Sequence, residues 1–562
     1  MSMANSPGPA PGRARKNLSA LPRAAKRNYY GAVGILALSS TALVADIVFP
    51  HTPYLRHNGS PLLESRLILL GLAVFAIYTF VLLRRDYAYY VKGAENGCGV
   101  APWYPRDWLG IRFLLETARA IKVNGLLQQR AELLEELGQT FFHQNFPDPF
   151  DTITTSEFEN VKAALSTKFE DWVLPDIRVA VFLPILGKHS IFTTNGAEWQ
   201  HSRAILRPAF VRDQISDLEA FDRHFKKLMA RIPRDGSPVD MQEMFLKMTT
   251  DSISDFMFGF STDLLGSAPP ESYKFGKMFD MAVHKIAVRA RLGWLTLLAP
   301  DKELDDATNF LRAFVDKYVK DVRQKRVAGD GGESGEGGGK KYIFLDELIK
   351  SSEPDDVIRD HLLSIFTAGR DTTTSVLTYL FLELSRRPDI VDRLRAEIAE
   401  LDEANPTWEH LRGMKYLNWT VKEALRLNPP VAANQRQAVR DTILPRGGGI
   451  DGKEPIFVRK GTQMRYMPWI MHRRREIFGE DADEFRPGRW EDLRVTHEYV
   501  PFNSGPRICI GQQFALTQIA FITFRLLSEF KAIERRDDRP PIQKLGVNLT
   551  MLHGCWVSLT PA

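Results

Sequence analysis

The chain has 562 residues, 44% of them hydrophobic, and is long enough to bury a large core. Its formal net charge is only +5, and its basic residues form no long run with interleaved aromatics, which argues against nucleic acid as a partner. The 3 cysteines have no CxxC spacing, which argues against a disulfide framework and a structural zinc site and favours a reducing compartment.

The N-terminal part of the chain differs in composition from the rest. Residues 1–28 are rich in Pro, Ala and Arg and contain no acid, which predicts a basic disordered tail. Residues 29–49 are a candidate transmembrane helix that contains one acidic residue, whereas 67–83 is apolar throughout and predicts a transmembrane helix. Because Arg84 and Arg85 follow the second span, the positive-inside tendency favours a membrane hairpin with both ends in the cytosol. A buried pair of core helices is the alternative.

Gly and Pro punctuation then separates this anchor from everything that follows. Residues 84–105, which end in GCGVAPWYP, are expected to form a hinge before a catalytic domain at 106–562. The pattern of this domain is mainly helical, with long helices expected at 157–172 and 309–326. The Gly-rich stretch 328–341 predicts a flexible surface insert. It lacks the spacing of a phosphate loop, and no GxGxxG follows an expected strand, so no flavin or nicotinamide site is expected.

One long helix is predicted at 352–387. Ser352 or Glu353 is expected to cap it, and Pro388 follows its end. At about 1.5 Å per residue, such a helix crosses a whole domain.

The middle of this helix, AGRDTT at 368–373, is a poor helix-forming sequence because a glycine and two β-branched residues lie close together. One interpretation is a buried helix whose threonine hydroxyls donate hydrogen bonds to preceding carbonyls. The other is that Gly369 lets a flat ligand approach the backbone, while Asp371 and Thr372 provide a chain of proton donors beside it.

A cysteine lies among glycines in PFNSGPRICIG at 501–511. A packing cysteine would be indifferent to its neighbours, whereas Phe502, Gly505, Arg507 and Gly511 surround Cys509 in a pattern suited to holding one sulfur atom. The stretch therefore predicts a ligand loop.

Two further motifs precede it. Glu423 and Arg426 are three residues apart, which places an acid and a base on one helix face. The segment FRPGRW at 485–490 supplies a second arginine, Arg489, in an expected turn.

The segment FNSGPRICIG resembles the FxxGxRxCxG loop of the cytochrome P-450 family of haem-thiolate monooxygenases. The resemblance covers residues 97–562 and places the other motifs in the family's order: GAEWQHSR at 196–203, AGRDTT, the Glu-x-x-Arg pair and FRPGRW. It implies the P-450 fold, mainly α with small β-sheets, in which haem lies between a long distal helix and a proximal Cys loop, here preceded by an N-terminal membrane anchor. The family's usual Pro-Glu-Arg is Pro487-Gly488-Arg489 in this chain, which keeps the arginine.

The resemblance also implies roles for individual residues. Haem b (iron protoporphyrin IX) is the expected cofactor, with Cys509 as the axial ligand of the iron, because a thiolate ligand favours O–O cleavage. Ala368 stands where some relatives carry a glutamate that ester-links haem, so haem without that bond is expected. Residues expected to bind the cofactor, including arginine partners of its propionates, are Trp199, Arg203, Ala368, Gly369, Arg436, Phe502, Gly505, Arg507, Cys509 and Gly511. Expected catalytic residues, which relay protons, are Asp371 and Thr372, and a structural triad is expected from Glu423, Arg426 and Arg489.

Several stretches resemble the fungal membrane-bound branch that hydroxylates n-alkanes and fatty acids, namely LPRGGG at 444–449, DADEFRPGRW at 481–490 and GQQFALTQIAFITFRLL at 511–527. Related fungal enzymes also oxidise polycyclic aromatics. The implied function is a membrane-anchored monooxygenase that inserts one oxygen atom from O2 into a hydrophobic substrate.

The resemblance implies electrons from NADPH through a separate flavoprotein, NADPH–cytochrome P-450 reductase, with cytochrome b5 and the lipid bilayer as further candidate partners. The implied location is the endoplasmic reticulum membrane, with the catalytic domain facing the cytosol. The run Arg473, Arg474 and Arg475 is a candidate basic docking face or simply a solvated surface.

Two alternatives remain open at this point. One is a haem-thiolate isomerase or dehydratase of fatty-acid hydroperoxides, against which the Asp371–Thr372 pair argues, since such enzymes need no proton relay for oxygen. The other is a non-catalytic haem-binding protein.

Overall fold

The computed structural model describes the larger part of the chain. The described residues are Thr296, separate positions between 69 and 90, and the ranges 91–104, 111–144, 151–210, 217–293, 300–327, 342–401 and 405–562. The chain divides into two compact units, of which the first comprises Met1–Ala101 and Asp441–Arg459 and the second Pro102–Arg440 and Lys460–Ala562. The inclusion of Asp441–Arg459 in the first unit is not predictable from the order of the motifs.

Several expectations for the N-terminal part fall on residues that the structure does not describe. Residues 1–28, 29–49 and 328–341 lie outside the described residues, and 67–83 is described only at separate positions. Within the described parts of the chain, no helix combines the length and the apolar character needed to cross a membrane.

The second unit is mainly helical, as predicted. Its α-helices are α3 (Ile111–Lys122), α4 (Leu126–Leu137), α5 (Phe158–Lys162), α6 (Asp176–Leu186), α7 (Gly196–Leu206), α9 (Leu218–Met229), α10 (Met241–Phe258), α11 (Pro270–Leu292), α12 (Lys302–Val327), α13 (Phe344–Lys350), α14 (Asp355–Leu384), α15 (Pro388–Ala399), α16 (Trp408–Gly413), α17 (Lys415–Leu427), α18 (Pro468–Met471), α19 (Arg475–Phe478) and α20 (Gln512–Glu529). Short turns are the π-helical η3 (Ala163–Thr167) and the 3-10 helices η4 (Phe169–Asp171), η5 (Arg207–Phe210), η7 (Pro487–Glu491) and η8 (Gly505–Arg507).

The strands form small sheets. The larger one has the order β1-β2-β8-β5-β3, with β2 and β8 parallel and the other pairs antiparallel. Further sheets have the orders β4-β12-β9 and β10-β11, and the hairpin β6-β7 lies in the first unit. The strands are β1 (Thr140–Gln144), β2 (Asp151–Thr155), β3 (Trp172–Val173), β4 (Val239–Asp240), β5 (Asn434–Ala438), β6 (Thr442–Gly448), β7 (Glu454–Val458), β8 (Gln463–Tyr466), β9 (Phe530–Arg535), β10 (Gln543–Leu545), β11 (Leu549–Met551) and β12 (Trp556–Pro561).

In the first unit, the hairpin β6-β7 packs on the segment that follows the apolar run. Lys92 Nζ lies 2.5 Å from Asp441 Oδ2, the rings of Tyr89 and Phe457 are 6.3 Å apart, and Gly99 forms a β-bridge with Ile456. The hairpin and the segment 89–99 are therefore one packed body, although they are far apart in the sequence.

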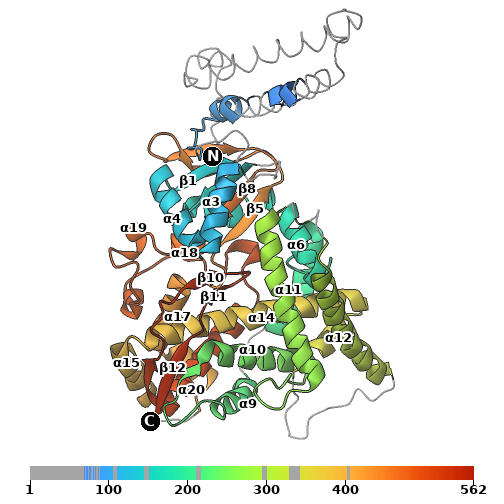
Figure 1. The fold of residues 1–562 in the computed structure, drawn as a ribbon, viewed down its shortest axis with the longest axis vertical. Coiled ribbons are helices and arrows are strands. Elements are labelled where there is room, and N and C mark those ends of the chain that lie inside the picture. The colour runs from blue at the N-terminus through green and yellow to red at the C-terminus, as the bar shows by residue number, and fades with distance from the viewer. Residues whose placement is uncertain are drawn as a thin grey trace, which may run out of the picture. The chain divides into compact units, whose positions relative to one another are not determined.

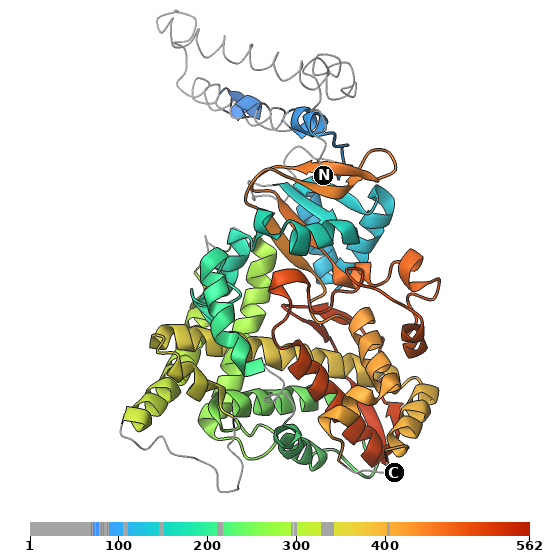
Figure 2. The same cartoon turned by 180° about the vertical axis from the view of Figure 1, so that it is seen from behind.

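Helix α14 runs through the middle of the second unit, and α10 lies alongside it (Figures 1 and 2). The predicted cap is wrong: the helix begins at Asp355 after Pro354, and no side chain caps it. Ser352 has a φ of 60° and so turns the chain before the helix begins. The helix ends at Leu384, and Pro388 is the first residue of α15, where its missing N–H costs nothing.

The two ends of α14 are buried in different apolar clusters. Ile358 and Phe366, in its first half, pack with residues of α6, α11 and α12, whereas Val376 and Leu384, in its second half, pack with α10, α17 and α20. The polar stretch between Phe366 and Val376 therefore lies where the two cores meet.

The single helix expected at 157–172 is wrong. The chain forms α5, the π-helical turn η3, the 3-10 helix η4 and then strand β3, where Trp172 pairs with Ala438 of β5. The sheet pairing of Trp172 requires an extended backbone, so tertiary contacts override the helical preference of the sequence.

Candidate active site

The loop around Cys509 has a fixed backbone. The N–H of Cys509 donates to the carbonyl of Phe502 at 2.9 Å, and the N–H of Ile508 donates to Gly505 at 3.0 Å. Gly505 has a φ of 67°, and a Cβ there would lie 1.8 Å from the carbonyl oxygen of Leu165 in η3. Only glycine fits this position, because the π-helical turn presses its backbone against the loop.

The Cys509 side chain is exposed, yet burial raises the pKa of its thiol. The residue is thus accessible at its surface while its thiol is largely surrounded by protein atoms. The N–H of Gly511 and the charge of Arg203 oppose the rise in this pKa. Both stabilise a thiolate, the form that binds metal.

Helix α14 has one partly accessible strip in its otherwise buried middle. Between Asp360 and Leu382, every residue is buried except Ala368, Gly369, Asp371 and Thr372. At about 100° of rotation per residue, these four positions share one side of the helix. The sequence-based prediction singled out the same four residues, and in the structure they are the partly accessible positions of this stretch; their role toward a ligand stays a prediction.

The hydroxyls of this helix donate back to carbonyls one turn earlier, as the first interpretation predicts. Thr372 Oγ1 donates to the Ala368 carbonyl at 2.5 Å, and Thr374 Oγ1 to that of Arg370 at 3.0 Å. Gly369 has a different neighbour from the expected flat ligand, since a Cβ there would lie 2.7 Å from Ile253 Cδ1 of α10. Close helix packing explains this glycine, and its role toward a ligand stays a prediction.

Burial raises the pKa of Asp371, an effect that the nearby Arg370 opposes and Asp280 supports. Arg370 Nη1 lies 3.4 Å from Asp371 Oδ1. The carboxyl can therefore hold a proton at a higher pH than an exposed aspartate.

Four arginines gather near the cysteine loop from distant parts of the sequence, namely Arg178, Arg203, Arg436 and Arg507. Burial lowers the pKa of Arg507 to about 9, and repulsion by Arg436, Arg178 and Arg203 adds to the effect. Arg507 stacks 4.4 Å above the ring of Trp199 and donates to the Thr194 carbonyl and to Asn195 Oδ1, both at 3.0 Å.

These arginines form no ion pair with a carboxylate anywhere in the part of the chain that the structure describes, and the Nε atoms of Arg178, Arg436 and Arg507 are buried without a hydrogen-bond partner. Neighbouring cations that are partly or fully buried are stabilised by an anion placed among them. The cluster therefore fits a ligand with one or two carboxylates. The structure brings Trp199, Arg203, Arg436 and Arg507 together, and their role toward a cofactor stays a prediction.

Arg178 was missed by the sequence analysis. It lies in the apolar helix α6, its guanidinium donates to Asn434 Oδ1 at 2.7 Å, and burial and Arg436 lower its pKa to about 10. A lone arginine in DIRVAVFLPIL is the one signal that marks it, since a cation inside an apolar helix needs a partner.

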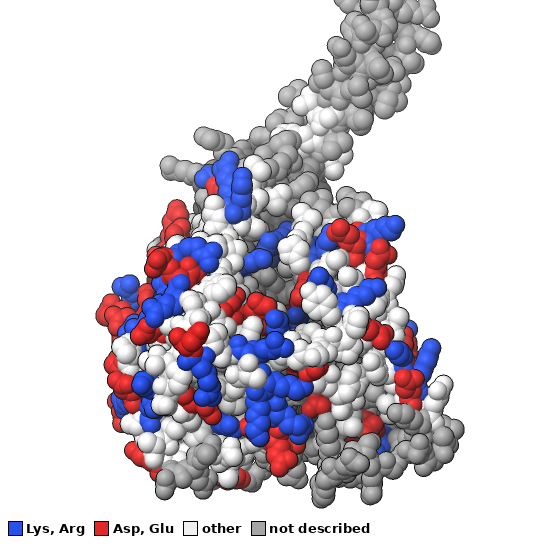
Figure 3. Space-filling view, turned by 60° about the horizontal axis from the view of Figure 1, so that its bottom comes forward, with Lys and Arg blue, Asp and Glu red and all other residues white. Residues whose placement is uncertain are grey.

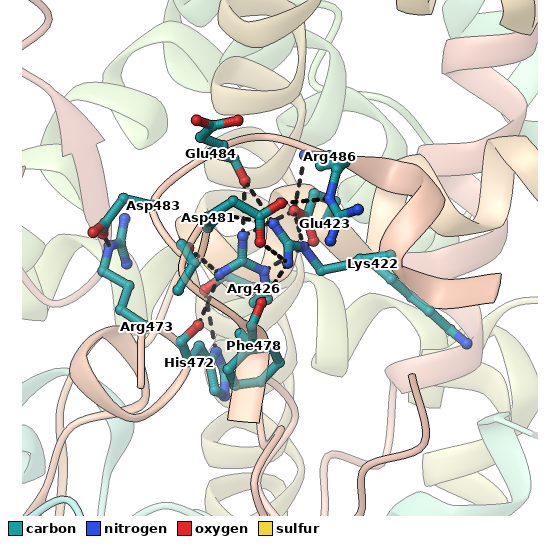
Figure 4. A network of polar contacts seen from close by, with 12 residues as sticks. Lys422, Glu423, Arg426, His472, Arg473, Phe478, Asp481, Asp483, Glu484 and Arg486 are labelled. Atoms are coloured by element: carbon teal, nitrogen blue, oxygen red, sulfur yellow. Dashed lines mark hydrogen bonds and ion pairs between the residues drawn. The ribbon is translucent and has the colours of Figure 1, made fainter. Parts of the chain in front are cut away.

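The residues of the predicted triad contact one another in one buried network, of which Figure 4 shows Glu423 and Arg426. Arg426 donates two hydrogen bonds to Glu423, from Nε to Oε2 at 2.9 Å and from Nη2 to Oε1 at 2.8 Å. Arg489 Nε donates to Glu423 Oε1 at 2.8 Å, and Trp490 Nε1 donates to Oε2 at 3.0 Å. Glu423 and Arg426 are both fully buried, so the network ties α17 to η7 by charge-assisted bonds.

His472 belongs to the same network and is neutral. Its Nε2 accepts from the N–H of Val500 at 2.9 Å, so Nδ1 carries the proton and donates to the Arg426 carbonyl at 3.2 Å. Burial lowers the pKa of this imidazole to about 3. The segment before the cysteine loop is thereby connected to the triad.

The sequence left the arginine run at 473–475 as either a basic docking face or a solvated surface, but Arg473 and Arg474 are half-buried and fit neither description. Arg473 stacks 3.9 Å from the Trp469 ring, and Arg474 donates to the Ser156 carbonyl at 3.1 Å. Arg475 is exposed, but it lies 3.5 Å from Glu480. Two of the three cations serve internal packing, because their long stems reach buried carbonyls and rings.

Comparisons with known proteins agree with this geometry. The family model described as Cytochrome P450 matches residues 114–553. Cytochrome P450 monooxygenase fsdH of Fusarium heterosporum is 39% identical over 477 residues, which cover 83% of this chain and 84% of the relative. Cytochrome P450 52A3-B of Candida maltosa is 37% identical over 513 residues, which cover 86% and 95%.

The chain therefore belongs to the cytochrome P450 family, and it is a P450 monooxygenase, an oxidoreductase. The predicted resemblance is confirmed. The family implies haem, and the residues fit this group. Cys509 has an accessible thiol, the arginine cluster has no carboxylate partner among the described residues, and the long buried helix α14 has an accessible strip.

Proposed function

We propose that this P450 is a membrane-anchored monooxygenase that inserts one oxygen atom of O2 into a hydrophobic substrate, namely an n-alkane, a fatty acid or a polycyclic aromatic. The observation that carries the proposal is the accessible strip of α14, where Asp371 and Thr372 are the polar groups and the rest of the surrounding helix is buried. An oxygen-activating enzyme needs an acid and an alcohol there, whereas a carrier or a hydroperoxide isomerase does not.

Cys509 would bind the haem iron, and haem would supply oxygen activation when bound. The arginines at 178, 203, 436 and 507 and the indole N–H of Trp199 would hold the propionates, because these arginines lie close together without a carboxylate partner and three of their Nε atoms are buried without a hydrogen bond. Phe502 would shield the sulfur, since its half-buried ring packs on the apolar core beside the loop.

Asp371 and Thr372 would move protons to the reacting oxygen. The Thr372 hydroxyl donates a hydrogen bond to the Ala368 carbonyl, so its oxygen can still accept a hydrogen bond from a second group. Reduction of O2 can end in two ways, each of which uses two electrons and two protons. Hydroxylation gives product and water, whereas uncoupled reduction gives hydrogen peroxide. The proton relay decides between them.

The proposed electron donor is a membrane-bound NADPH–cytochrome P450 reductase at the endoplasmic reticulum, with cytochrome b5 as a second candidate. The apolar run at 67–83 supports the anchor. Figure 3 shows a face on which Lys and Arg side chains gather, with Asp and Glu among them, and such a face suits a partner of opposite charge.

Labelled oxygen tests the reaction and the substrate class together. The membrane-reconstituted enzyme, with reductase and NADPH, is incubated under labelled O2 with a pooled alkane, fatty acid and polycyclic aromatic. We expect one labelled atom in a product, identified by mass spectrometry, and none with Cys509→Ala. Consumption of a hydroperoxy fatty acid without NADPH, with no label from O2, would contradict the proposal and favour the isomerase.

A further inference from the structure

Arg370 lies between two carboxylates on different helices. Its Nη2 donates to Asp280 Oδ1 of α11 at 2.5 Å, while its Nη1 lies 3.4 Å from Asp371 Oδ1 of its own helix. The stronger contact is therefore with Asp280, and the contact with Asp371 is the looser one. Figure 1 shows α11 crossing α14, which lets the two helices share this guanidinium.

The three groups lie on a path from the surface to the strip. The side chain of Asp280 is 55% exposed, that of Arg370 only 2% and that of Asp371 14%. Arg370 is the buried middle of the path, and Asp280 is its solvent end.

Two further contacts fix the guanidinium. Arg370 Nε donates to Thr250 Oγ1 of α10 at 2.9 Å, and its Cζ lies 5.1 Å from the centre of the Phe279 ring. Three helices therefore hold Arg370 in place, so it cannot turn fully toward Asp371 unless the bond to Asp280 is lost.

We propose that Asp280 is a positioning residue for the proton relay: by engaging one arm of Arg370, it keeps Asp371 only loosely paired and free to exchange its proton. The inference rests on the proposed role of Asp371. A carboxylate locked in a close pair with arginine is a poor proton carrier, because it is held ionised and cannot reorient. Sharing Arg370 with Asp280 prevents that state.

The effects of the two neighbouring charges on the pKa of Asp371 agree with this arrangement of the three side chains. The charged groups that act on Asp371 are Arg370, which lowers its pKa, and Asp280, which raises it. The residues that face this region from α10 are uncharged, Thr250 and Ile253. Loss of the Asp280 charge should therefore lower the pKa of Asp371, and loss of Arg370 should raise it.

The test compares Asp280→Asn and Arg370→Gln. Product formed per NADPH consumed should fall as the pH rises through the pKa of Asp371. We expect the midpoint of this pH profile to move down by about half a pH unit in Asp280→Asn, less than the 1 to 3 units that a close buried charge produces. It should move up in Arg370→Gln. Infrared titration of the buried carboxylic acid band, assigned by its loss in Asp371→Asn, should show the same two shifts without turnover.

Glu271→Gln is the matched control, because Glu271 lies on the same helix and pairs with Lys317 of α12 at 3.1 Å. It should leave both titrations unchanged. Shifts in the same direction for the two variants, or none in correctly folded Asp280→Asn, would overturn the inference. If Asp371→Asn itself retains full coupling, the proposed role of Asp371 fails first; if it uncouples while Asp280→Asn does not shift, this inference alone fails.

Discussion

Individual side chains carry the strongest functional predictions. Cys509→Ala should remove the thiolate ligand, and the reduced, carbon monoxide-treated protein should lose its thiolate-type absorption band. Cys98→Ala is the control, since Cys98 lies in the first unit and its thiol donates to the Asn96 carbonyl. An unchanged spectrum in Cys509→Ala would contradict the ligand assignment.

Thr372 is the second residue whose role can be separated from folding. Thr372→Ala should bind haem and substrate normally but divert reducing equivalents to hydrogen peroxide, measured as product and peroxide per NADPH. By the usual contribution of a proton-transfer group, product formation should fall by about 10²-fold or more. Thr378→Ala is the matched control, because Thr378 makes the same bond to a carbonyl one turn earlier, at 2.7 Å, but is buried away from the strip.

Sequence reasoning at this scale identified the cysteine loop and the strip on α14 because each is contiguous in the chain. It missed Arg178, which acts only through its proximity to Arg436, 258 positions later in the chain. It also mistook Arg473 and Arg474 for surface cations, because a sequence does not show which way a long side chain points. The bridge from Arg370 to Asp280 is hidden for the same reason.

Among the structural elements, η3 and the cysteine loop depend on each other. Gly505→Ala places a Cβ 1.8 Å from the Leu165 carbonyl and forces alanine to a φ of 67°. The backbone conformation alone costs about 1 to 2 kcal/mol, so we expect poor haem retention, measured by the ratio of haem to protein absorbance. Gly488→Ala, which has no atom within 4 Å of the added Cβ, should retain haem like the wild type. Equal retention in the two variants would show that the contact is not needed.

The elements also show where periodicity succeeds and fails. The long helix was predicted at 352–387 and is observed at Asp355–Leu384, because its apolar pattern and its flanking prolines are local signals. The segment 157–172 was predicted as one helix, yet Trp172 leaves it to pair with Ala438. That partner is contributed by a distant strand, so no local pattern indicates it.

At the scale of the whole molecule, the triad of Glu423, Arg426 and Arg489 joins α17 to η7 and so stabilises the second unit. Glu423→Gln should leave Arg426 and Arg489 buried without their counter-charge, and breaking such a pair typically costs about 3 to 5 kcal/mol. We expect a large drop in the midpoint of thermal unfolding of the haem-loaded protein. Glu491→Gln, a nearby exposed acid, should change that midpoint little. A similar midpoint for both variants would remove the structural role of Glu423.

The arginine cluster has a consequence for how the protein is made. Arg178, Arg203 and Arg436 repel Arg507 in the folded chain, and a dianion bound beside them would oppose that repulsion and stabilise the fold. A ligand that binds only the folded chain shifts the folding equilibrium toward it, so we expect haem loading to raise the midpoint of thermal unfolding. The supply of cofactor would then help to set how much folded enzyme a cell maintains.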